Sequence, residues 1–206
     1  MVADALNLCF RGWNETEESD VCVREWMKME MDTRELTRAE VDQVWQIDRR
    51  EVIEAVYRRE GSKLILQREH HDISGWPPGE AEAYGPVLRD CFDRGGTFIG
   101  VFDKAEKLIA VSVLESRLIG EKEDRLQLKF LHVNRAHRGQ QLGAKLFALS
   151  VARARELGAR ELYISATPSK NTVDFYLNLG CRLAAEIDPD LYELEPEDIH
   201  LEYVIP

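Results

Sequence analysis

The feature that most constrains this chain is a passage from an extended apolar segment, through a short basic loop, into a strongly apolar helix. Residues 126–133 alternate in polarity as a half-buried strand does, and this predicts that one face carries Leu126, Leu128, Phe130 and His132. Residues 142–157 are apolar over much of a helical surface, and Gly158 ends them. The chain is therefore expected to contain a buried strand–loop–helix unit.

The rest of the pattern predicts a mixed sheet with helices on both faces. A capping box from Thr37 to Glu40 opens a long amphipathic helix that we expect to reach Arg59 before Gly61 ends it. An irregular loop is predicted over 70–79 and a helix from there to Arg94. Strands are predicted at 63–66, 97–102, 108–118, 162–166 and 199–204, with a short helix at 172–179.

Length and composition indicate one domain. The 206 residues give a domain over 31–206, preceded by an acidic, aperiodic extension at 1–30. The net charge of −11 argues against nucleic-acid binding. No apolar run approaches membrane-helix length, and the first residues do not resemble a signal peptide, so we expect a cytoplasmic protein with no membrane partner. The four cysteines have no disulfide-like or metal-like spacing.

The loop between the strand and the helix has the chemistry of an anion site. It reads Arg138-Gly139-Gln140-Gln141-Leu142-Gly143. The first turn of a helix offers unpaired N–H groups and the positive end of the helix dipole, which suits a phosphate or pyrophosphate. Arg138 and Lys145 could add charge-assisted hydrogen bonds. The spacing is neither that of a P-loop nor that of a dinucleotide fingerprint.

The same loop resembles the signature of the GNAT superfamily of acyl-CoA-dependent N-acyltransferases, which is [R/Q]-x-x-G-x-[G/A] between a strand and a helix. Arg138 and Gly143 match it, whereas Gln141 stands where the middle glycine usually lies. Gln141 can present its backbone N–H there provided that its φ is negative. The segments Leu162–Ala166 and Asn171–Cys181 resemble the second half of the family, and element order is similar from Met31 to Pro206.

The resemblance implies acetyl-CoA as co-substrate and a GNAT-like fold. This is a mostly antiparallel sheet in which one parallel pair of strands, ending at Val133 and near Ala166, splays apart. Pantetheine would lie in that gap and the pyrophosphate on the loop amides. The implied cofactor-binding residues are Leu131, His132, Val133, Arg138, Gly139, Gln140, Gln141, Leu142, Gly143, Ala144 and Asn171. Asn171 would equally serve as a helix N-cap.

The resemblance also implies direct attack of an amine on the thioester. Tyr176 occupies the general-acid position of the family, although a mid-helix tyrosine beside Phe175 would also suit the core. Glu115 is the first candidate for the base that deprotonates the amine, or else a solvent-facing strand residue. Glu51, Glu54 and a water-mediated base are the other candidates.

Trp76 and Asp72 lie in the segment that would cover the acceptor site. An aromatic ring with a carboxylate suits a cationic amine, while a tryptophan that pins a proline-rich loop to the core is the alternative. We expect no metal site, because His132 and His137 do not form an HExxH motif and His70-His71-Asp72 is a weak cluster in a loop, where exposed histidines are usually bystanders.

The sequence therefore predicts an N-acetyltransferase that moves an acetyl group from acetyl-CoA to a primary amine of a small molecule or peptide in a ternary complex. A non-catalytic acyl-CoA-binding sensor is the alternative. A weaker third possibility is an ATP-binding protein that uses the same helix terminus. The expected assembly is a monomer or homodimer.

Overall fold

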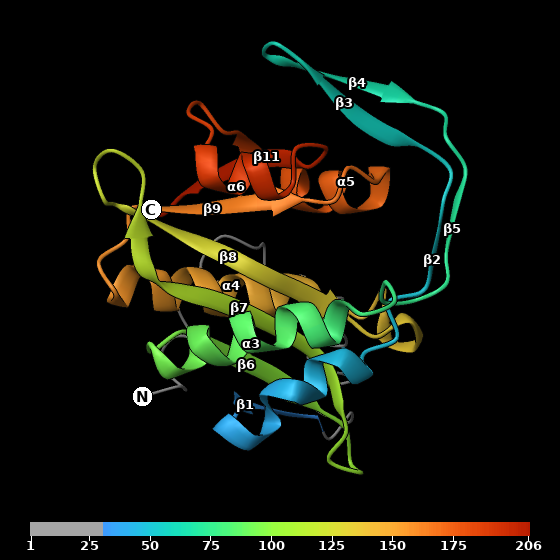
Figure 1. The fold of residues 1–206 in the computed structure, drawn as a ribbon, viewed down its shortest axis with the longest axis vertical. Helices are drawn as coiled ribbons and strands as arrows, with labels where there is room; N and C mark the ends of the chain where they lie inside the picture. The colour runs from blue at the N-terminus through green and yellow to red at the C-terminus, as the bar shows by residue number, and fades with distance from the viewer. Residues whose placement is uncertain (1–30) are drawn as a thin grey trace, which may run out of the picture.

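The central sheet of the computed structural model is mixed, as predicted (Figure 1). The structure describes residues 31–206, so the extension predicted at 1–30 lies outside the described residues. Seven strands form the sheet in the order β1, β6, β7, β8, β9, β11, β10. Their bounds are Asp32–Glu35, Thr97–Phe102, Leu108–Ile119, Arg125–Val133, Glu161–Ala166, Ile199–Val204 and Arg182–Leu183. Neighbours pair antiparallel except for β8 and β9, which are parallel.

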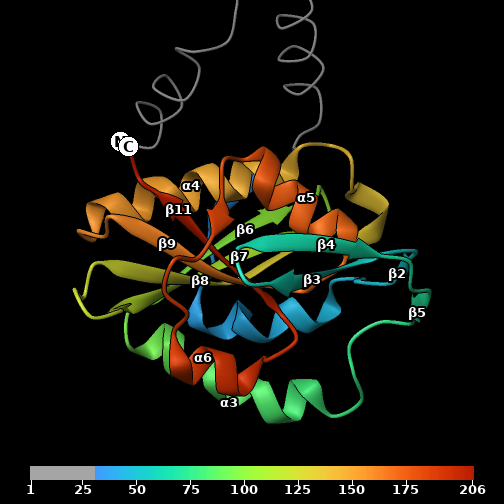
Figure 2. The ribbon, with the colours of Figure 1, turned by 90° about the horizontal axis from the view of Figure 1, so that it is seen from above.

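Helices cover both faces of this sheet (Figure 2). On one face lie α4 (Leu142–Glu156) and α5 (Lys170–Asn178). On the other lie the 3-10 helix η1 (Arg38–Gln46), α3 (Glu80–Asp93) and α6 (Pro189–Leu194). The apolar core divides accordingly, because Phe147 and Val173 of the first face and Val44 and Leu88 of the second belong to different buried clusters. This layering leaves the two sides of the β8–β9 pair lined by different helices.

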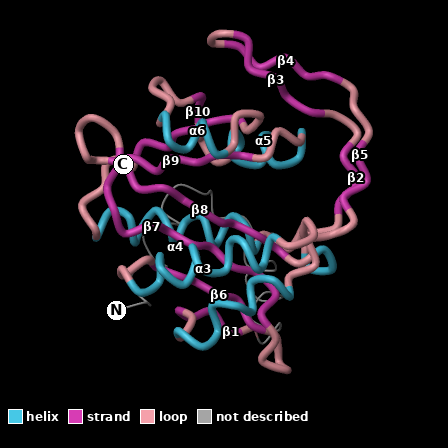
Figure 3. The backbone as a smooth tube through the Cα atoms, in the orientation of Figure 1, coloured by secondary structure: helices cyan, strands magenta, loops and turns pink. Residues whose placement is uncertain are grey.

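The long helix predicted from Thr37 to Arg59 is wrong. The Thr37–Glu40 capping box is present, with the Thr37 N–H 2.8 Å from the Glu40 carboxylate, but the helix ends at Gln46. The chain then leaves the main sheet as an extended excursion, residues 51–73, which Figure 3 shows. The excursion consists of two antiparallel strand pairs, β2 with β5 and β3 with β4. Their bounds are Glu51–Ile53, His71–Ile73, Val56–Glu60 and Lys63–Gln67.

Gly61 explains the error, because it lies in a hairpin turn and does not end a helix. Its φ is 60°, and it occupies the first position of the loop that joins Glu60 to its partner Lys63. Glycine at this position favours a two-residue hairpin, and the flanking β-branched and aromatic residues favour strands. The irregular loop predicted over 70–79 is likewise interrupted by β5.

The prediction that Leu126, Leu128, Phe130 and His132 share one face of β8 is also wrong, because β8 contains a bulge. Val113 pairs with Phe130 while Leu114 pairs with Leu128, which leaves Lys129 as an extra residue. Leu128 therefore packs into the cluster that contains α4, and Phe130 into the one that contains α3. The bulge re-aims the end of β8 immediately before the basic loop.

Candidate active site

The strands β8 and β9 pair only where they begin. Arg125, Leu126 and Gln127 pair with Glu161, Leu162 and Tyr163, and no pairing between the two strands follows. From there the strands diverge, as Figure 1 shows. The N–H of Asn134 points to β7, where it binds the carbonyl of Ile109 at 2.8 Å.

Backbone direction alternates along a strand, so the N–H and C=O groups of Leu131 and Val133 face the side that β9 has left. This edge is suited to an extended ligand with amide groups of its own, since such a ligand could pair with the strand as a further strand would.

The loop after β8 presents a row of unused backbone donors. Within residues 31–206, no group accepts a hydrogen bond from the amides of Gly139 to Ala144. Gly139 and Gln141 have φ values of 78° and 60°, so left-handed residues alternate with ordinary ones just before the first turn of α4. Successive N–H groups in such a conformation converge as an anion-binding nest, and the dipole of α4 adds positive potential.

The condition that we set for Gln141, a negative φ, is not met, because the residue adopts the left-handed conformation that the middle glycine of the motif suits best. Its N–H nevertheless has no acceptor among the described residues, so the condition was unnecessary. Gly143 is required for a different reason. A Cβ built on Gly143 would lie 3.2 Å from the ring of Phe175 in α5 and 3.6 Å from Leu131. The start of α4 therefore lies against both α5 and β8.

Arg138 and Lys145 do not present their side chains as simple anion ligands. The Arg138 guanidinium donates to the carbonyls of Val133 and Arg49 at 3.3 and 3.2 Å and lies 3.5 Å from the Glu51 carboxylate. The Lys145 ammonium donates to Thr33 at 2.8 Å, and burial lowers its pKa. In this conformation the loop offers its backbone amides, and not these two side chains, to an anion.

Asn171 is not the N-cap of α5. That position belongs to Ser169, whose hydroxyl accepts from the N–H of Thr172 at 3.2 Å. The Asn171 amide donates instead to Glu51 at 3.0 Å. Glu51 also approaches Arg138, so it links two expected cofactor residues, Arg138 in the loop after β8 and Asn171 in the helix after β9.

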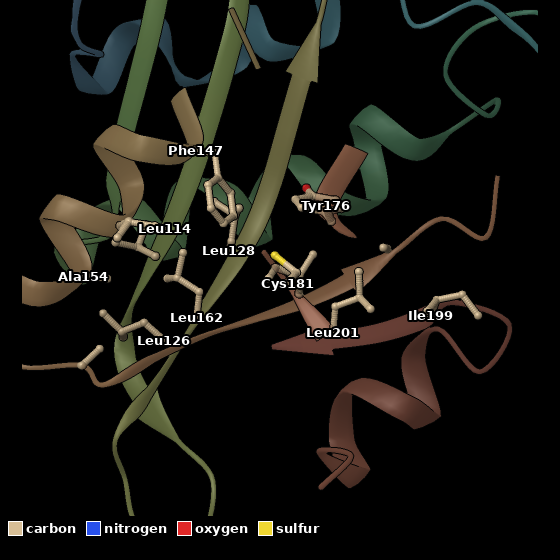
Figure 4. Packing of buried hydrophobic residues seen from close by; sticks show 14 of the residues in the cluster. Leu114, Leu126, Leu128, Phe147, Ala154, Leu162, Tyr176, Cys181, Ile199 and Leu201 are labelled. Atoms are coloured by element: carbon tan, nitrogen blue, oxygen red, sulfur yellow. The ribbon is translucent and has the colours of Figure 1, made fainter. Parts of the chain in front are cut away.

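Tyr176 lies in α5, between the diverging strands and the core (Figure 4). Its ring packs edge-on against Phe147 and Phe175, and 6% of the residue is exposed. No described residue hydrogen-bonds its hydroxyl, which nevertheless is not fully enclosed. Burial, followed by the nearby Cys181 and Asp198, raises its pKa, so the hydroxyl keeps its proton at neutral pH. The packing and acid interpretations are compatible at this position.

Glu115 is engaged in an ion pair. Both carboxylate oxygens accept from the Arg94 guanidinium, at 3.0 and 3.1 Å, and 7% of the residue is exposed. Burial alone would raise its pKa, but the hydrogen bonds from Arg94 and Cys91 outweigh burial and lower it. A carboxylate held in this way is a weak base, so the geometry does not favour the catalytic assignment of Glu115.

Trp76 belongs to an aromatic cluster on the α3 face of the sheet. Its indole N–H donates to the Ile47 carbonyl at 2.9 Å, and its ring stacks on Phe130 and meets the edge of His132. The guanidinium of Arg49 lies 4.9 Å from the Trp76 ring centre. Trp76 therefore pins its loop to the core and also reaches the end of β8. Asp72 is exposed on β5 opposite Val52 and shares no described contact with Trp76.

His132 is only partly covered, yet its imidazole stays neutral. Burial first, and then the positive charges of Arg49 and Arg138, lower its pKa to about 3. The expected cofactor contact through the His132 backbone is not favoured, because the N–H and C=O groups of His132 face β7, where it pairs with Val111. Its side chain instead joins Trp76 and Phe130 on the opposite face of the sheet from α4.

Sequence reasoning missed two residues near the diverging strands, Arg49 and Asp198. Asp198 directly precedes β11, one position beyond the pair that joins Ile199 to Ala166 at the end of β9. Burial and the Glu195 carboxylate raise its pKa to about 7, against the opposite effect of Arg49. The only signal available in the sequence was a carboxylate directly before the last strand.

Two wider properties of the described residues bear on function. Within 31–206, no three His, Cys, Asp or Glu side chains are grouped closely enough to hold a metal ion. Over the same residues, no helix combines the length and apolarity needed to cross a bilayer.

Comparison with known proteins identifies relatives of this architecture. Residues 62–181 match the model of the acetyltransferase (GNAT) family. No protein with a curated description matches the chain.

Several solved structures share the fold. One is nourseothricin acetyltransferase, with a TM-score of 0.63 at 16% identity, over 85% of this chain and 99% of that one. Another is a putative streptothricin acetyltransferase from Bacillus anthracis in complex with acetyl coenzyme A, at 0.59 and 14%, over 86% and 99%. A GNAT family N-acetyltransferase from Escherichia coli in complex with CoA aligns at 0.55 and 13%, over 85% and 82%.

Proposed function

The chain belongs to the GNAT acetyltransferase family and is an acyl-CoA-dependent N-acyltransferase that uses acetyl-CoA, and on this premise we propose how its own residues carry out the transfer. In our proposal a primary amine of a small molecule or peptide attacks the thioester directly, while both substrates are bound. Holding the two reactants in one site supplies much of the rate, because it removes the entropic cost of their encounter.

The observation that carries this proposal is the nest of free amides at the start of α4, next to the exposed backbone edge of β8. We propose that the pyrophosphate of CoA accepts hydrogen bonds from the amides of Gly139 to Ala144. The pantetheine amides would pair with Leu131 and Val133. These two contacts aim the thioester between β8 and β9, toward Tyr176 and the aromatic cluster. Arg138 and Asn171 would shape the loop and α5 through Glu51.

We further propose that Tyr176 protonates the leaving thiolate. A raised pKa keeps the phenol protonated, and the absence of a described partner leaves its proton available for transfer. The proton goes from the phenolic oxygen to the CoA sulfur as the carbon–sulfur bond breaks. A general acid that matches its leaving group contributes about 10²–10⁴-fold in rate.

The acceptor is proposed as a cationic primary amine. Trp76 and Tyr84 supply aromatic rings on the side of the sheet opposite α4, and Arg49 and Lys129 already lie over them. An acceptor ammonium would take the place of one of these cations on a ring face. Two of the similar structures are named as acetyltransferases of nourseothricin and of streptothricin, which makes these compounds reasonable members of a test panel. Asp72 would act only at the periphery, from the exposed face of β5.

A non-catalytic acyl-CoA sensor is the alternative, and the unpartnered Tyr176 hydroxyl argues for catalysis over it, since a sensor has no use for an available phenolic proton. The ATP-binding possibility is weaker. The unpaired backbone edge of β8 suits the amide groups of pantetheine, and ATP has no such amide groups.

The test is release of free CoA thiol from acetyl-CoA, measured with a panel of polyamines, lysine peptides, amino sugars and streptothricins. Thermal unfolding with acetyl-CoA, CoA and ATP is recorded in parallel. Stabilisation by both CoA species but not ATP, with amine-dependent thiol release, is the expected result. Stabilisation without release for any amine would favour the sensor.

A further inference from the structure

We propose that Asp198 is the catalytic base that takes the proton from the acceptor ammonium, so that acid and base approach the thioester from α5 and from the start of β11. This inference rests on the proposed function and names a residue that the motif does not contain.

Asp198 is placed by the pairing of the strand that follows it. Ile199 pairs with Ala166, the last residue of β9, so Asp198 lies beyond the end of β9 where β8 and β9 have already separated. The carboxylate is close enough to influence the Tyr176 hydroxyl, and the Arg49 guanidinium from the opposite face of the sheet acts on it in turn. Asp198 thus lies just past the end of β9, within electrostatic reach of both the Tyr176 hydroxyl and the Arg49 guanidinium.

The other candidate carboxylates already have partners. Glu115 accepts from Arg94 with both oxygens. Glu51 bridges Asn171 and Arg138. Glu54 lies 3.2 Å from His70, and its side chain is 74% exposed.

Asp198 differs from all of these. Its side chain forms no hydrogen bond or ion pair with any residue in 31–206, although the residue is partly buried. A carboxylate that is available and close to the reacting centre is the better candidate for proton transfer.

Three titratable or charged groups face Asp198, namely Glu195 in the turn after α6, Arg49 after η1 and the Tyr176 hydroxyl of α5. Burial and Glu195 favour the protonated acid, and Arg49 favours the carboxylate, with a resulting pKa of about 7. A base works best when its pKa is near the working pH, because it must be ionised and still hold the proton that it receives.

The chemical step balances. One N–H proton of the acceptor ammonium passes to the Asp198 carboxylate, and the freed lone pair attacks the thioester carbon. The carbon–sulfur bond breaks, and the sulfur takes the Tyr176 proton. The nitrogen loses its second proton, through solvent, to the tyrosinate. Asp198 returns its proton to water, so the products are an amide, CoA thiol and one proton.

The experiment compares wild type, Asp198→Asn, Asp198→Glu and Glu195→Gln in the thiol-release assay between pH 5.5 and 9.5. For wild type we expect kcat/KM to rise through an acid limb near pH 7 and level off. Asp198→Asn should lower the plateau by about 10²-fold or more and abolish the limb, whereas Asp198→Glu should recover part of the rate. Stabilisation by acetyl-CoA should be unchanged in all variants.

Glu195→Gln is the matched control, since it removes a neighbouring carboxylate and leaves Asp198 in place. Without the charge of Glu195 the acid limb should move to lower pH while the plateau is kept. Wild-type rates and an unchanged limb in Asp198→Asn would overturn the inference alone. A wild type that binds acetyl-CoA but acetylates no amine would overturn the proposed function and the inference with it.

Discussion

Replacing Gln141 with glycine should stabilise the protein, which is unusual for a mutation that introduces glycine. Gln141 has a φ of 60° and a ψ of 8°. An L-residue in this left-handed conformation costs about 1–2 kcal/mol, which glycine does not incur. Glycine also gives the unfolded chain more freedom, which costs about 0.5–1 kcal/mol. The difference predicts that Gln141→Gly gains about 0.5–1 kcal/mol in free energy of unfolding.

Gln141→Ala is the control, because alanine keeps the strain and removes only the side chain. Urea unfolding of the three proteins should give unchanged m-values and the highest midpoint for the glycine variant. The affinity for CoA should not fall, since the nest is retained. If alanine equals or exceeds glycine in stability, Gln141 does not occupy the left-handed conformation in solution, and the nest as described is wrong.

Three further predictions concern the site and its support. Arg94→Leu leaves Glu115 buried without its partner and should lower the free energy of unfolding in urea by about 2–4 kcal/mol. Arg38→Leu is the control, because Arg38 and Asp93 form a pair whose side chains are 50% and 52% exposed, and it should cost under about 1 kcal/mol; equal costs would contradict the account of Glu115. Tyr176→Phe should lower kcat by about 10²-fold with little loss of stability, and an unchanged kcat would remove the acid role of Tyr176. Tyr163→Phe is the control, because it loses the hydrogen bonds of its hydroxyl with His200 and Asp188 at 2.8 and 3.0 Å and should lower the free energy of thermal unfolding by about 1–2 kcal/mol. The folded pKa of Asp198 lies above its unfolded value, so its contribution to stability is complete below about pH 4 and is lost as the pH rises through about 7. The rise from 3.8 to about 7 caps this effect at about 4 kcal/mol, and partial exposure reduces it to about 1–2, so Asp198→Asn should become more stable than wild type above pH 7 but not at pH 4; parallel pH–stability curves would contradict it.

The sequence predicted the part of the fold in which local pattern and burial agree. Two parts are present as predicted: the strand, loop and helix from Leu126 to Leu157, and the hairpin of β6 and β7. Their apolar segments have the periodicity and length that are typical of strands and helices. The stretch from Glu51 to Arg59 was mistaken for helix, because apolar residues at spacings of three and four also occur in a short twisted hairpin, whereas the strand predicted at 63–66 is present as β4. Gly61 decides between the two only through its φ, which the sequence does not state.

The site was predictable only where a motif marks it. The loop amides follow from Arg138 and Gly143, whereas the bulge at Lys129 depends on pairing with β7, which acts at long range. Glu115 looked available because its partner Arg94 is far from it in the sequence. Asp198 was missed because nothing local distinguishes it, and its character comes from Glu195, Arg49 and burial together.

The most direct test of the central claim is a titration of ¹⁵N-labelled protein with CoA, followed by the amide signals of Gly139, Gln141 and Gly143. If the pyrophosphate sits on the nest, these signals should shift together, downfield and saturably, with CoA and with acetyl-CoA, while the amide of Gly61 on the distant hairpin should stay in place. If CoA binds and these amides do not move, the cofactor lies elsewhere, and the site described at the start of α4 is wrong.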